Sequence, residues 1–323
     1  MTFKIKLLFE LYIDNLKNRA FSPNTIRSKK RAFKKFDLFL QSKKISSIHA
    51  ITRKDLSLFQ KHLRSHVTSN GCFIKIKTQN DILVSIKTFF DFLEYQDLIT
   101  ANPAKFIQFA KEPKEIIRNI LTNNEVSKIL GSIDIHTIDG FRNRAILELL
   151  YSTGIRIMEL INLNLCDLDL ENKELRILNG KGKKDRLVPL NNPAHKFLKN
   201  YTAYIRPVFA KNFKLSLNNA LRSGKSEDNQ ALFLNIYGER MRETGLRHML
   251  KKYLELANIK KNVSFHSFRH TLATELLRNG VQLRYIQALL GHKSITATQI
   301  YTKVVIEDLK KAYKKFHPRN KID

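Results

Sequence analysis

Apolar side chains recur at three- and four-residue steps through the first hundred residues, and the alternation typical of β-strands is nearly absent there. The stretch from Phe3 to Leu98 shows this spacing, for example at Phe33, Phe36 and Phe39. Such spacing places the apolar side chains on one face of each helix, so several helices have to bury these faces against one another. The sequence therefore predicts a small all-helical bundle over residues 1–110.

Two helix starts in this region are indicated by local motifs. Ser22 precedes Pro23, which is typical of an N-cap residue followed by proline at the first helical position. Thr52 stands three residues before Asp55, which resembles a capping box with aspartate in place of glutamate. Both motifs predict that a helix begins at these points.

A change of composition separates this bundle from the rest of the chain. Residues 111–121 contain Pro113 among alternating charges, which favours a linker. Directly after them, Thr122 and Glu125 form a capping-box pattern that opens a new helix. Since 323 residues exceed the length of about 100–200 residues usual for one domain, we expect a second domain over residues 122–323.

The second domain is predicted to open with helices and then to change its period. Leu175 and Ile177 precede a turn rich in glycine and lysine at residues 179–185, and Leu187 and Val188 follow it. Two short apolar runs around a glycine-bearing turn are typical of a β-hairpin. The predicted fold class is therefore mainly α: an N-terminal helical bundle, then an α+β domain that carries a small antiparallel hairpin or sheet.

The chain carries a large excess of positive charge. Lys and Arg number 58 against 29 Asp and Glu, a formal net charge of +29, and both predicted domains share the excess. A polyanion is the natural partner of such a chain, and we expect that partner to be nucleic acid. Association with a ribosome or with a membrane surface would also produce this pattern of charge.

Cysteine usage and hydropathy indicate the compartment. Cys72 and Cys166 are too few for a disulfide framework or a Cys-rich zinc site, which favours a reducing environment. No apolar run approaches the ~20 residues of a membrane helix, and Glu10 and Asp14 interrupt the opening segment where a signal peptide would be apolar. We therefore expect a cytoplasmic protein without a membrane partner.

Several common catalytic motifs do not occur in the sequence, namely a His-Glu-x-x-His helix, a Gly-x-Ser-x-Gly elbow and a glycine-rich phosphate loop. Among the remaining candidates, His266 and Arg269 lie three residues apart at a helix start and so share one face. Arg156 stands among apolar neighbours, where burial would require an anion or a carboxylate such as Glu159. Each of these residues alone could equally be structural.

The full set of cations, in its order along the chain, resembles the tyrosine recombinases of the phage integrase family, most closely the short Xer-type members. The motifs that carry the resemblance are Thr153-Gly154-Ile155-Arg156-x-x-Glu159-Leu160, Gly180-Lys181-Gly182, His266-x-x-Arg269-His270, Leu290-Gly291-His292 and Thr298-Gln299-Ile300-Tyr301-Thr302. The likeness extends over essentially the whole chain, because the basic helical bundle resembles the core-binding domain of that family and the second domain its catalytic domain. The resemblance implies six catalytic residues, which are Arg156, Lys181, His266, Arg269, His292 and Tyr301.

The resemblance also implies the roles of three of these residues in cleavage. Arg156 and Arg269 would hold the two non-bridging oxygens of a scissile phosphate, for which permanently charged, bidentate guanidinium groups are suited. Tyr301 would be the nucleophile, whose attack on phosphorus leaves a 3′-phosphotyrosyl bond and a free 5′-hydroxyl. Because the bond energy is kept in that intermediate, no cofactor is implied.

Proton transfer falls to the other residues. His266 is implied as the base that accepts the proton of the attacking phenol, and Lys181 as the acid that protonates the departing 5′-oxygen. Lys183 and Lys184 are nearby alternatives for the acid, and His292 would hydrogen-bond the same phosphate. With this many fixed cations a metal ion is chemically redundant, and we expect none.

As a whole, the resemblance implies a site-specific recombinase that binds double-stranded DNA and exchanges strands through a Holliday junction. It would act as a tetramer of identical or of two different recombinase subunits on two sites, and its expected role is the resolution of chromosome or plasmid dimers. Integration of a phage or mobile element is the alternative, although many such integrases carry a further N-terminal domain for which little room precedes Phe3. A non-catalytic, architectural DNA-binding protein of this fold would lack one of the six residues, and none is missing.

Cations that bind DNA are expected on the second predicted helix and on the hairpin turn. The residues concerned are Arg27, Lys29, Lys30, Lys34 and Lys183. With Phe33 and Phe36 packed inward, the charges on the helix should point outward, whether they contact DNA or form a solvated face.

Three stretches depart from the family pattern or lie beyond its motifs. Phe265 stands where the family often has proline, and residues 211–230 form a longer polar segment than in the shortest members. Residues 309–316 carry several lysines in a helix-like pattern. The resemblance implies that this last segment docks on a neighbouring subunit, and a basic, solvated tail is the alternative.

Overall fold

The computed structural model describes residues 5–67, 71–112, 120–178, 185–212 and 230–291. It divides into two compact units, Met1–Glu115 and Ile116–Asp323, and each has its own hydrophobic core. The division falls within the predicted linker 111–121, of which residues 113–119 lie outside the described residues.

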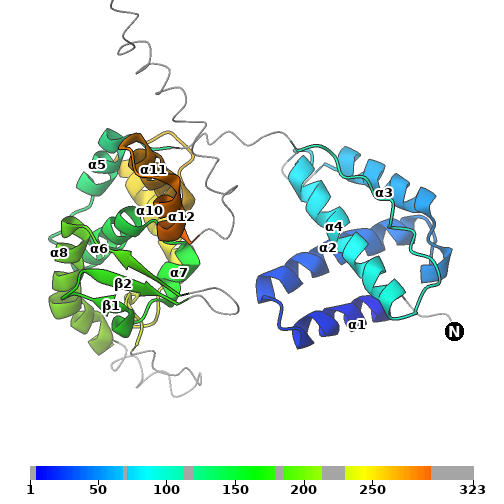
Figure 1. Ribbon diagram of the computed structural model, residues 1–323, viewed down its shortest axis with the longest axis horizontal. Coiled ribbons are helices and arrows are strands. Elements are labelled where there is room, and N and C mark those ends of the chain that lie inside the picture. Colours follow the sequence, from blue (N-terminus) through cyan, green and yellow to red (C-terminus); the bar gives the residue numbers. More distant parts are fainter. Residues whose placement is uncertain (1–4, 68–70, 113–119, 179–184, 213–229, 292–323) are drawn as a thin grey trace, which may run out of the picture. The chain divides into compact units, whose positions relative to one another are not determined.

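The described part of the first unit is helical and is drawn in blue to cyan in Figure 1. Its elements are α1 (Ile5–Asn18), α2 (Pro23–Ser42), the 3-10 helix η1 (Ile48–Ala50), α3 (Arg53–Ser65) and α4 (Ile76–Tyr95). Both predicted helix starts are confirmed, since Ser22 Oγ accepts a hydrogen bond from Thr25 N at 3.1 Å, and Thr52 and Asp55 form a reciprocal capping box. Local side-chain chemistry thus sets where α2 and α3 begin.

Aromatic side chains fill the centre of the first unit. The rings of Phe9 and Phe33 stack with their centroids 4.4 Å apart, and Phe36 packs on Phe59 at 4.8 Å. Phe89 of α4 meets Phe9 of α1, also with centroids 4.8 Å apart. Because Phe33 and Phe36 both belong to this core, they fix which face of α2 is buried.

The chain that follows α4 returns along the same unit. Asn80 donates from Nδ2 to Ala110 O at 2.9 Å and accepts from Ala110 N at 3.1 Å. Ile107 is buried in the aromatic core. The segment through Ala110 is therefore packed as part of the first unit.

The described part of the second unit combines helices with a small sheet. Its helices are α5 (Asn123–Gly131), α6 (Ile138–Thr153), α7 (Ile157–Asn162), α8 (Asn192–Asn200), α10 (Glu243–Leu256), α11 (Phe265–Arg278) and α12 (Leu283–Leu290), with the 3-10 helix η2 (Leu165–Asp167) and the π-helix η3 (Tyr201–Ile205). Thr122 and Glu125 form the predicted capping box at the start of α5. Among the described helices of either unit, none combines the length and the apolar character that crossing a bilayer requires.

The sheet has three antiparallel strands in the order β1 (Leu168–Asp169), β2 (Glu174–Ile177) and β3 (Arg186–Pro189). Leu175 pairs with Val188 and Ile177 with Arg186, so the predicted hairpin is confirmed, while its turn at 179–184 lies outside the described residues. The sequence does not predict β1, because two residues are too few to show a period. The predicted fold class, mainly α with a helical bundle and an α+β domain, is confirmed.

Helix α6 organises the second unit. Ala145, Ile146 and Leu149 on this helix have no exposed surface, and the helix contacts α5, α8, α11 and β3. Its C-terminal end lies close to α11 and α12, since a Cβ atom added at Gly154 would lie 2.9 Å from Leu290 and 3.0 Å from a leucine of α11. The end of α6 is thus the point at which segments from distant parts of the sequence meet.

Candidate active site

The turn between α6 and α7 presents Arg156. Gly154 ends α6 in the left-handed conformation, with φ of 60°, and Arg156 then occupies the N-cap of α7. A side chain at position 154 would strain the backbone and force the Leu290 side chain to shift, so glycine is favoured there. The N–H of Arg156 donates to Glu159 Oε2 at 2.9 Å, and Arg156 Nη2 donates to Gly291 O at 3.4 Å. The turn therefore directs this guanidinium group toward the end of α12.

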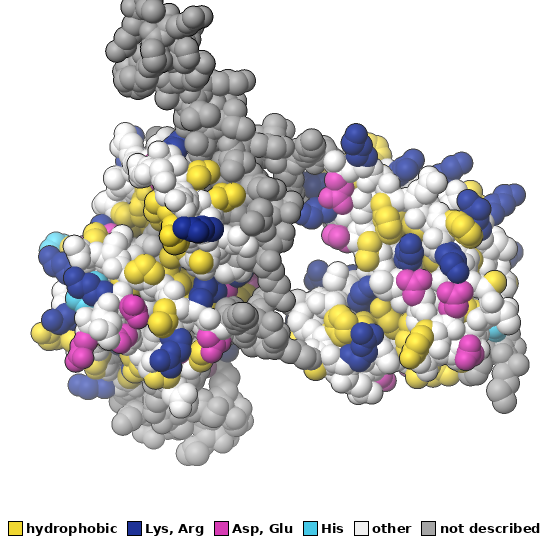
Figure 2. All heavy atoms as spheres, in the orientation of Figure 1, with side chains coloured by type: hydrophobic (Ala, Val, Ile, Leu, Met, Phe, Trp, Pro, Cys, Tyr) yellow, Lys and Arg dark blue, Asp and Glu magenta, His cyan; other side chains and the backbone are white. Residues whose placement is uncertain are grey.

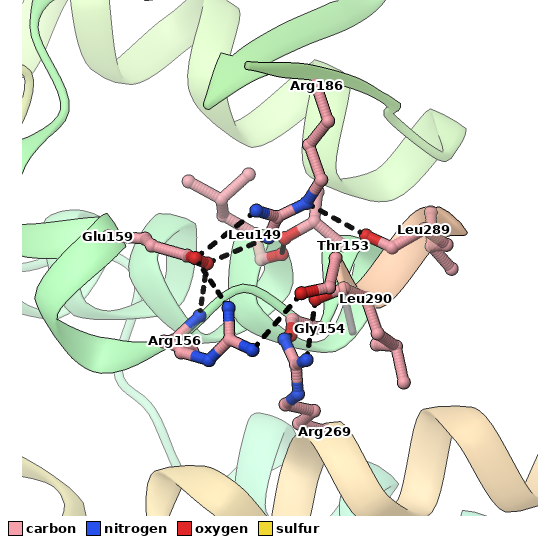
Figure 3. A network of polar contacts seen from close by, with 10 residues as sticks. Leu149, Thr153, Gly154, Arg156, Glu159, Arg186, Arg269, Leu289 and Leu290 are labelled. Atoms are coloured by element: carbon pink, nitrogen blue, oxygen red, sulfur yellow. Dashed lines mark hydrogen bonds and ion pairs between the residues drawn. The ribbon is translucent and has the colours of Figure 1, made fainter. Parts of the chain in front are cut away.

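The Glu159 carboxylate lies between two guanidinium groups (Figure 3). Arg156 Nη1 donates to Oε1 at 2.8 Å, and Arg186 donates from Nη2 to Oε2 at 2.8 Å and from Nη1 to Oε1 at 3.2 Å. Burial alone would raise the pKa of this carboxyl group, but hydrogen bonds and positive charge from Arg186 and Arg156 lower it to about 2. Glu159 is therefore an anion at neutral pH, and the expected pairing with Arg156 is confirmed.

Arg269 reaches the same place from α11. Only 4% of this residue is exposed, and its guanidinium group donates from Nη1 to Gly154 O at 2.7 Å and from Nη2 to Leu290 O at 2.6 Å. Arg156 donates to the carbonyl of Gly291, one residue further along. Two guanidinium groups from distant parts of the sequence thus converge on the C-terminal end of α12 (Figure 3).

His266 stands on α11 three residues before Arg269. Its ring is accessible to solvent, yet partial burial and the positive charges of Arg269, Arg156 and Arg247 lower its pKa. A neutral imidazole has one unprotonated ring nitrogen, which can accept a proton at neutral pH. The fold therefore places a proton acceptor on the same face of α11 as Arg269.

Three of the six predicted catalytic residues, Lys181, His292 and Tyr301, lie outside the described residues. For two of them, Lys181 and His292, the nearest described segment of the chain reaches the arginine cluster. Strand β3, which follows the turn with Lys181, begins at Arg186, and the C-cap of α12, Gly291, directly precedes His292. The described part of the site consists of two arginines, a histidine and the contacts that hold them.

Arg186 is the member of this cluster that the sequence does not single out. Its side chain is 10% exposed and donates from Nε to Leu289 O at 3.1 Å, in addition to both oxygens of Glu159. Its neighbours Leu187 and Val188 are apolar, and an arginine buried beside such residues requires a carboxylate from elsewhere in the chain. That carboxylate, Glu159, lies 27 residues away in the chain, so no local pattern in the sequence points to Arg186.

Two family models match the chain. The model of the phage integrase family covers residues 119–307, and the model of the phage integrase N-terminal SAM-like domain covers residues 9–97. The chain belongs to the phage integrase family. The resemblance carried by the motifs of the second domain is therefore confirmed.

This member of the phage integrase family is similar to Xer tyrosine recombinases over nearly its whole length. It is 36% identical to tyrosine recombinase XerC of Pelotomaculum thermopropionicum over 316 residues, 97% of each chain. It is 34% identical to tyrosine recombinase XerD of Staphylococcus saprophyticus over 301 residues, which cover 93% of this chain and 95% of XerD. The chain is thus an Xer-type tyrosine recombinase, an enzyme of site-specific DNA recombination.

A solved structure shows the same fold. The XerH site-specific recombinase matches with a TM-score of 0.70 at 23% identity, over 90% of this chain and 79% of that chain.

In the present chain, Phe265 is the first residue of α11 and is buried. Proline is also tolerated at a first helical position, so the departure at this residue changes core packing and leaves the helix start in place.

Other predicted features of the recombinase fall outside the described residues. These are Lys183, most of the polar segment 211–230 (residues 213–229) and the lysine-bearing segment 309–316. Their predicted roles stay predictions.

Lys29, one of the predicted DNA-binding residues, does not point outward. Its Nζ donates to Thr88 Oγ1 of α4 at 2.5 Å, and burial lowers the pKa of this lysine. The expectation that all charges of α2 lie outward is wrong here, because position 29 lies four residues before Phe33 and seven before Phe36, on the buried stripe of the helix. The other predicted cations of α2, which are Arg27, Lys30 and Lys34, are exposed.

Lysines and acidic residues alternate in the groove between α1 and α2. Lys17 pairs with Asp14 at 2.7 Å, and Lys6 lies 3.7 Å from Asp37. Lys30 and Lys34 line the same groove. Figure 2 shows acidic side chains among the Lys and Arg side chains of the first unit. Positive charge in this groove is therefore largely compensated.

The groove between α2 and α3 has a different charge pattern. It has a volume of about 520 Å³, and its described lining contains no acidic residue. The residues that bear or can acquire positive charge there are Arg31, Lys34, Lys35, His62 and His66. The rings of His62 and His66 lie 5.7 Å apart, and burial, Lys35 and His62 together lower the pKa of His66. Positive charge in this α2–α3 groove is uncompensated.

Proposed function

We propose that the second unit cleaves and rejoins double-stranded DNA at one active centre. Its six members are Arg156, Lys181, His266, Arg269, His292 and Tyr301. The observation that supports this proposal most strongly is that the guanidinium groups of Arg156 and Arg269 meet at the end of α12, directly before His292. Two fixed cations beside a proton acceptor are what the displacement of a phosphodiester oxygen needs.

The two arginines are suited to bind the scissile phosphate. Attack at phosphorus increases the negative charge on the non-bridging oxygens, and donors that are already fixed stabilise this charge without reorganising. Arg156 and Arg269 are fixed by Glu159 and by backbone carbonyl groups. The Arg156 side chain is 32% exposed, so a ligand can reach it.

The reaction would proceed by two reversible transesterifications. In the first, the Tyr301 phenol oxygen bonds to phosphorus, the bond from phosphorus to the 5′-oxygen breaks, and a 3′-phosphotyrosyl link remains. His266 accepts the phenol proton, and Lys181 supplies a proton to the departing 5′-oxygen. In the second, a 5′-hydroxyl of the partner strand displaces Tyr301. Since the number of phosphodiester bonds is conserved, the scheme needs no cofactor.

For the first unit, we infer that DNA phosphates contact the α2–α3 groove. Uncompensated positive charge attracts the phosphate backbone, whereas lysines already paired with Asp14 or Asp37 gain less from it. Lys34 lines both grooves, and Arg31 and Lys35 extend the cationic set beyond the residues that the sequence singles out. Arg27, Lys30 and Lys183 stay as flanking candidates.

The biological role that we propose is the resolution of chromosome or plasmid dimers in the cytoplasm. This role would require a tetramer on two DNA sites, with exchange through a Holliday junction. The similarity to XerC and XerD supports it, and relatives of this fold have been solved with DNA, among them XerH with its difH substrate. Chromosome partition and cell division would depend on this activity.

Integration of a mobile element is the second candidate. The same fold occurs in the Tn1549 transposon integrase, solved with transposon right end DNA, and in a lambda integrase dimer bound to a core site. Mapping the genomic fragments bound by the protein separates the two roles. Binding near the replication terminus supports dimer resolution, and binding at an element boundary supports integration.

The substitution Tyr301→Phe tests the proposed chemistry. The variant should bind its site with unchanged affinity and yield no covalent protein–DNA adduct on a nicked substrate, because it lacks the nucleophilic oxygen. The control is Tyr285→Phe, which removes the hydroxyl of an exposed tyrosine on α12 and should leave the adduct yield unchanged. An adduct of undiminished yield from Tyr301→Phe would contradict the proposal.

A further inference from the structure

Arg186 connects three elements that are distant in sequence. It lies at the start of β3, bonds both carboxylate oxygens of Glu159 on α7, and donates to Leu289 O on α12. These contacts use donors on three different nitrogens of one planar group, which a lysine cannot reproduce. The guanidinium group of Arg186 therefore fixes the mutual geometry of β3, α7 and α12.

The close approach of Gly291 shows how tightly α12 is held. Gly291 is in the left-handed conformation, with φ of 63°, and a Cβ atom added there would lie 2.9 Å from Arg186 Nη1 and 3.1 Å from its Cζ. The backbone next to His292 therefore packs directly against the Arg186 guanidinium group. Gly291 O in turn accepts the hydrogen bond from Arg156.

The Glu159 carboxylate contacts two guanidinium groups, whereas a purely structural ion pair requires only one. Arg144 offers the comparison, since it also donates to a buried glutamate, Glu148, and to a backbone carbonyl at 2.8 Å. Within the part of the chain that the structure describes, no second arginine contacts that carboxylate. Glu159, by contrast, holds Arg186 on one side and the accessible Arg156 on the other.

We propose that Arg186 is a positioning residue for DNA cleavage, which orients Arg156 through Glu159 and fixes the backbone that precedes His292. This inference rests on the proposed function, in which Arg156 binds the scissile phosphate. Without Arg186, the Glu159 carboxylate loses one of its two guanidinium partners, so the direction of Arg156 is less firmly fixed. Displacement of a phosphate-binding group by about 1 Å can cost about 10²-fold in rate.

The first experiment compares Arg186→Lys with Arg144→Lys. Single-turnover cleavage is measured at saturating recombinase on a nicked substrate, with DNA affinity and thermal unfolding recorded in parallel. We expect Arg186→Lys to cleave about 10²-fold more slowly with unchanged DNA affinity. Arg144→Lys should lower thermal stability and leave cleavage by the folded protein unchanged. Equal cleavage rates for the two variants would overturn the inference.

The second experiment uses a substrate whose scissile phosphate carries a methyl group in place of one non-bridging oxygen. This change removes the negative charge that Arg156 is proposed to stabilise, so the defect of Arg156→Ala should shrink on one diastereomer. If Arg186 acts through Arg156, the defect of Arg186→Lys shrinks on that same diastereomer. A role in stability alone would leave the Arg186→Lys defect equal on both substrates.

The outcomes separate the inference from the proposed function. If the methyl substitution reduces the cleavage defect of Arg156→Ala but not that of Arg186→Lys, the positioning role of Arg186 is wrong while the phosphate-binding role of Arg156 stands. If Arg156→Ala cleaves the ordinary phosphate at the wild-type rate, the proposed function itself fails. Should Arg186→Lys not fold, Glu159→Gln replaces it, because this variant keeps the shape of the side chain and removes the charge. Wild-type cleavage by Glu159→Gln would overturn the inference.

Discussion

The two units of this recombinase treat charge in opposite ways. In the first unit, the described residues that are buried and polar are all uncharged: Gln79, Asn80, Ser85 and Asn102. In the second unit, the described buried residues include the charged side chains Arg142, Glu148, Asp167, Arg206 and Arg269. An aromatic core fixes the first unit and leaves most of its described cations at the surface, with Lys29 as an exception, whereas the second unit uses buried cations to join its elements.

The difference shows that one excess of positive charge serves two physical purposes. Exposed cations attract the phosphate backbone over a distance and need no fixed geometry. Buried guanidinium groups, in contrast, have to be desolvated and paired, and their partners hold them in place. Proximity to a reacting phosphorus requires a fixed cation, and both arginines that we propose to be catalytic lie in the unit that buries charge.

The largest expected effect concerns the aromatic core. Phe36 is fully buried against Phe59 and Phe90, so Phe36→Ala should lower the free energy of unfolding of the first unit by about 3–5 kcal/mol. Chemical denaturation monitored by circular dichroism measures the change. Leu38→Ala, on the exposed face of the same helix, is the control and should change it by less than about 0.5 kcal/mol. A loss below about 1 kcal/mol for Phe36→Ala would show that the core is not what fixes this unit.

The next effect concerns the buried ion pairs of the second unit under acid. The folded-state pKa of Glu159 is lowered from 4.5 to about 2, so its stabilising contribution is complete above pH 4.5 and is lost as the pH falls toward 2. The free-energy difference between wild type and Glu159→Gln should therefore shrink by up to about 3 kcal/mol across this window. Urea unfolding at several pH values measures it. A difference that stays constant between pH 5 and pH 2 would contradict the role of Glu159 as a buried anion.

The smallest effect concerns the surface cations of the first unit. Lys35→Ala, in the α2–α3 groove, should reduce the slope of log affinity against log salt concentration by about 1, because one phosphate contact is lost. Lys17→Ala, whose lysine already pairs with Asp14, should leave the slope unchanged. Salt titrations of binding to duplex DNA measure both slopes. Identical slopes for the two variants would remove the distinction between the two grooves.

Much of the fold is readable from the sequence because it depends on local chemistry. The caps at Ser22, Thr52 and Thr122 need only residues three positions away, and the hairpin is visible as a change of period. Strand β1 cannot be predicted from local sequence in this way, because it is defined only by its pairing with β2.

The candidate site is predictable in a different way. Arg156, His266 and Arg269 are found by their order in a family pattern, and the pairing of Arg156 with Glu159 follows from the cost of burying a charge. Arg186 and the inward position of Lys29 depend on contacts between elements distant in sequence, with Glu159 and Thr88. No local pattern reports such contacts, so they require the tertiary structure.

The close approach between Gly291 and the Arg186 guanidinium group couples these two positions of the sequence. A side chain at 291 would strain the backbone and force the Arg186 side chain to shift, and a shorter residue at 186 would remove one of the two guanidinium partners of Glu159. The effect of a substitution at one of these positions should therefore depend on the residue that occupies the other.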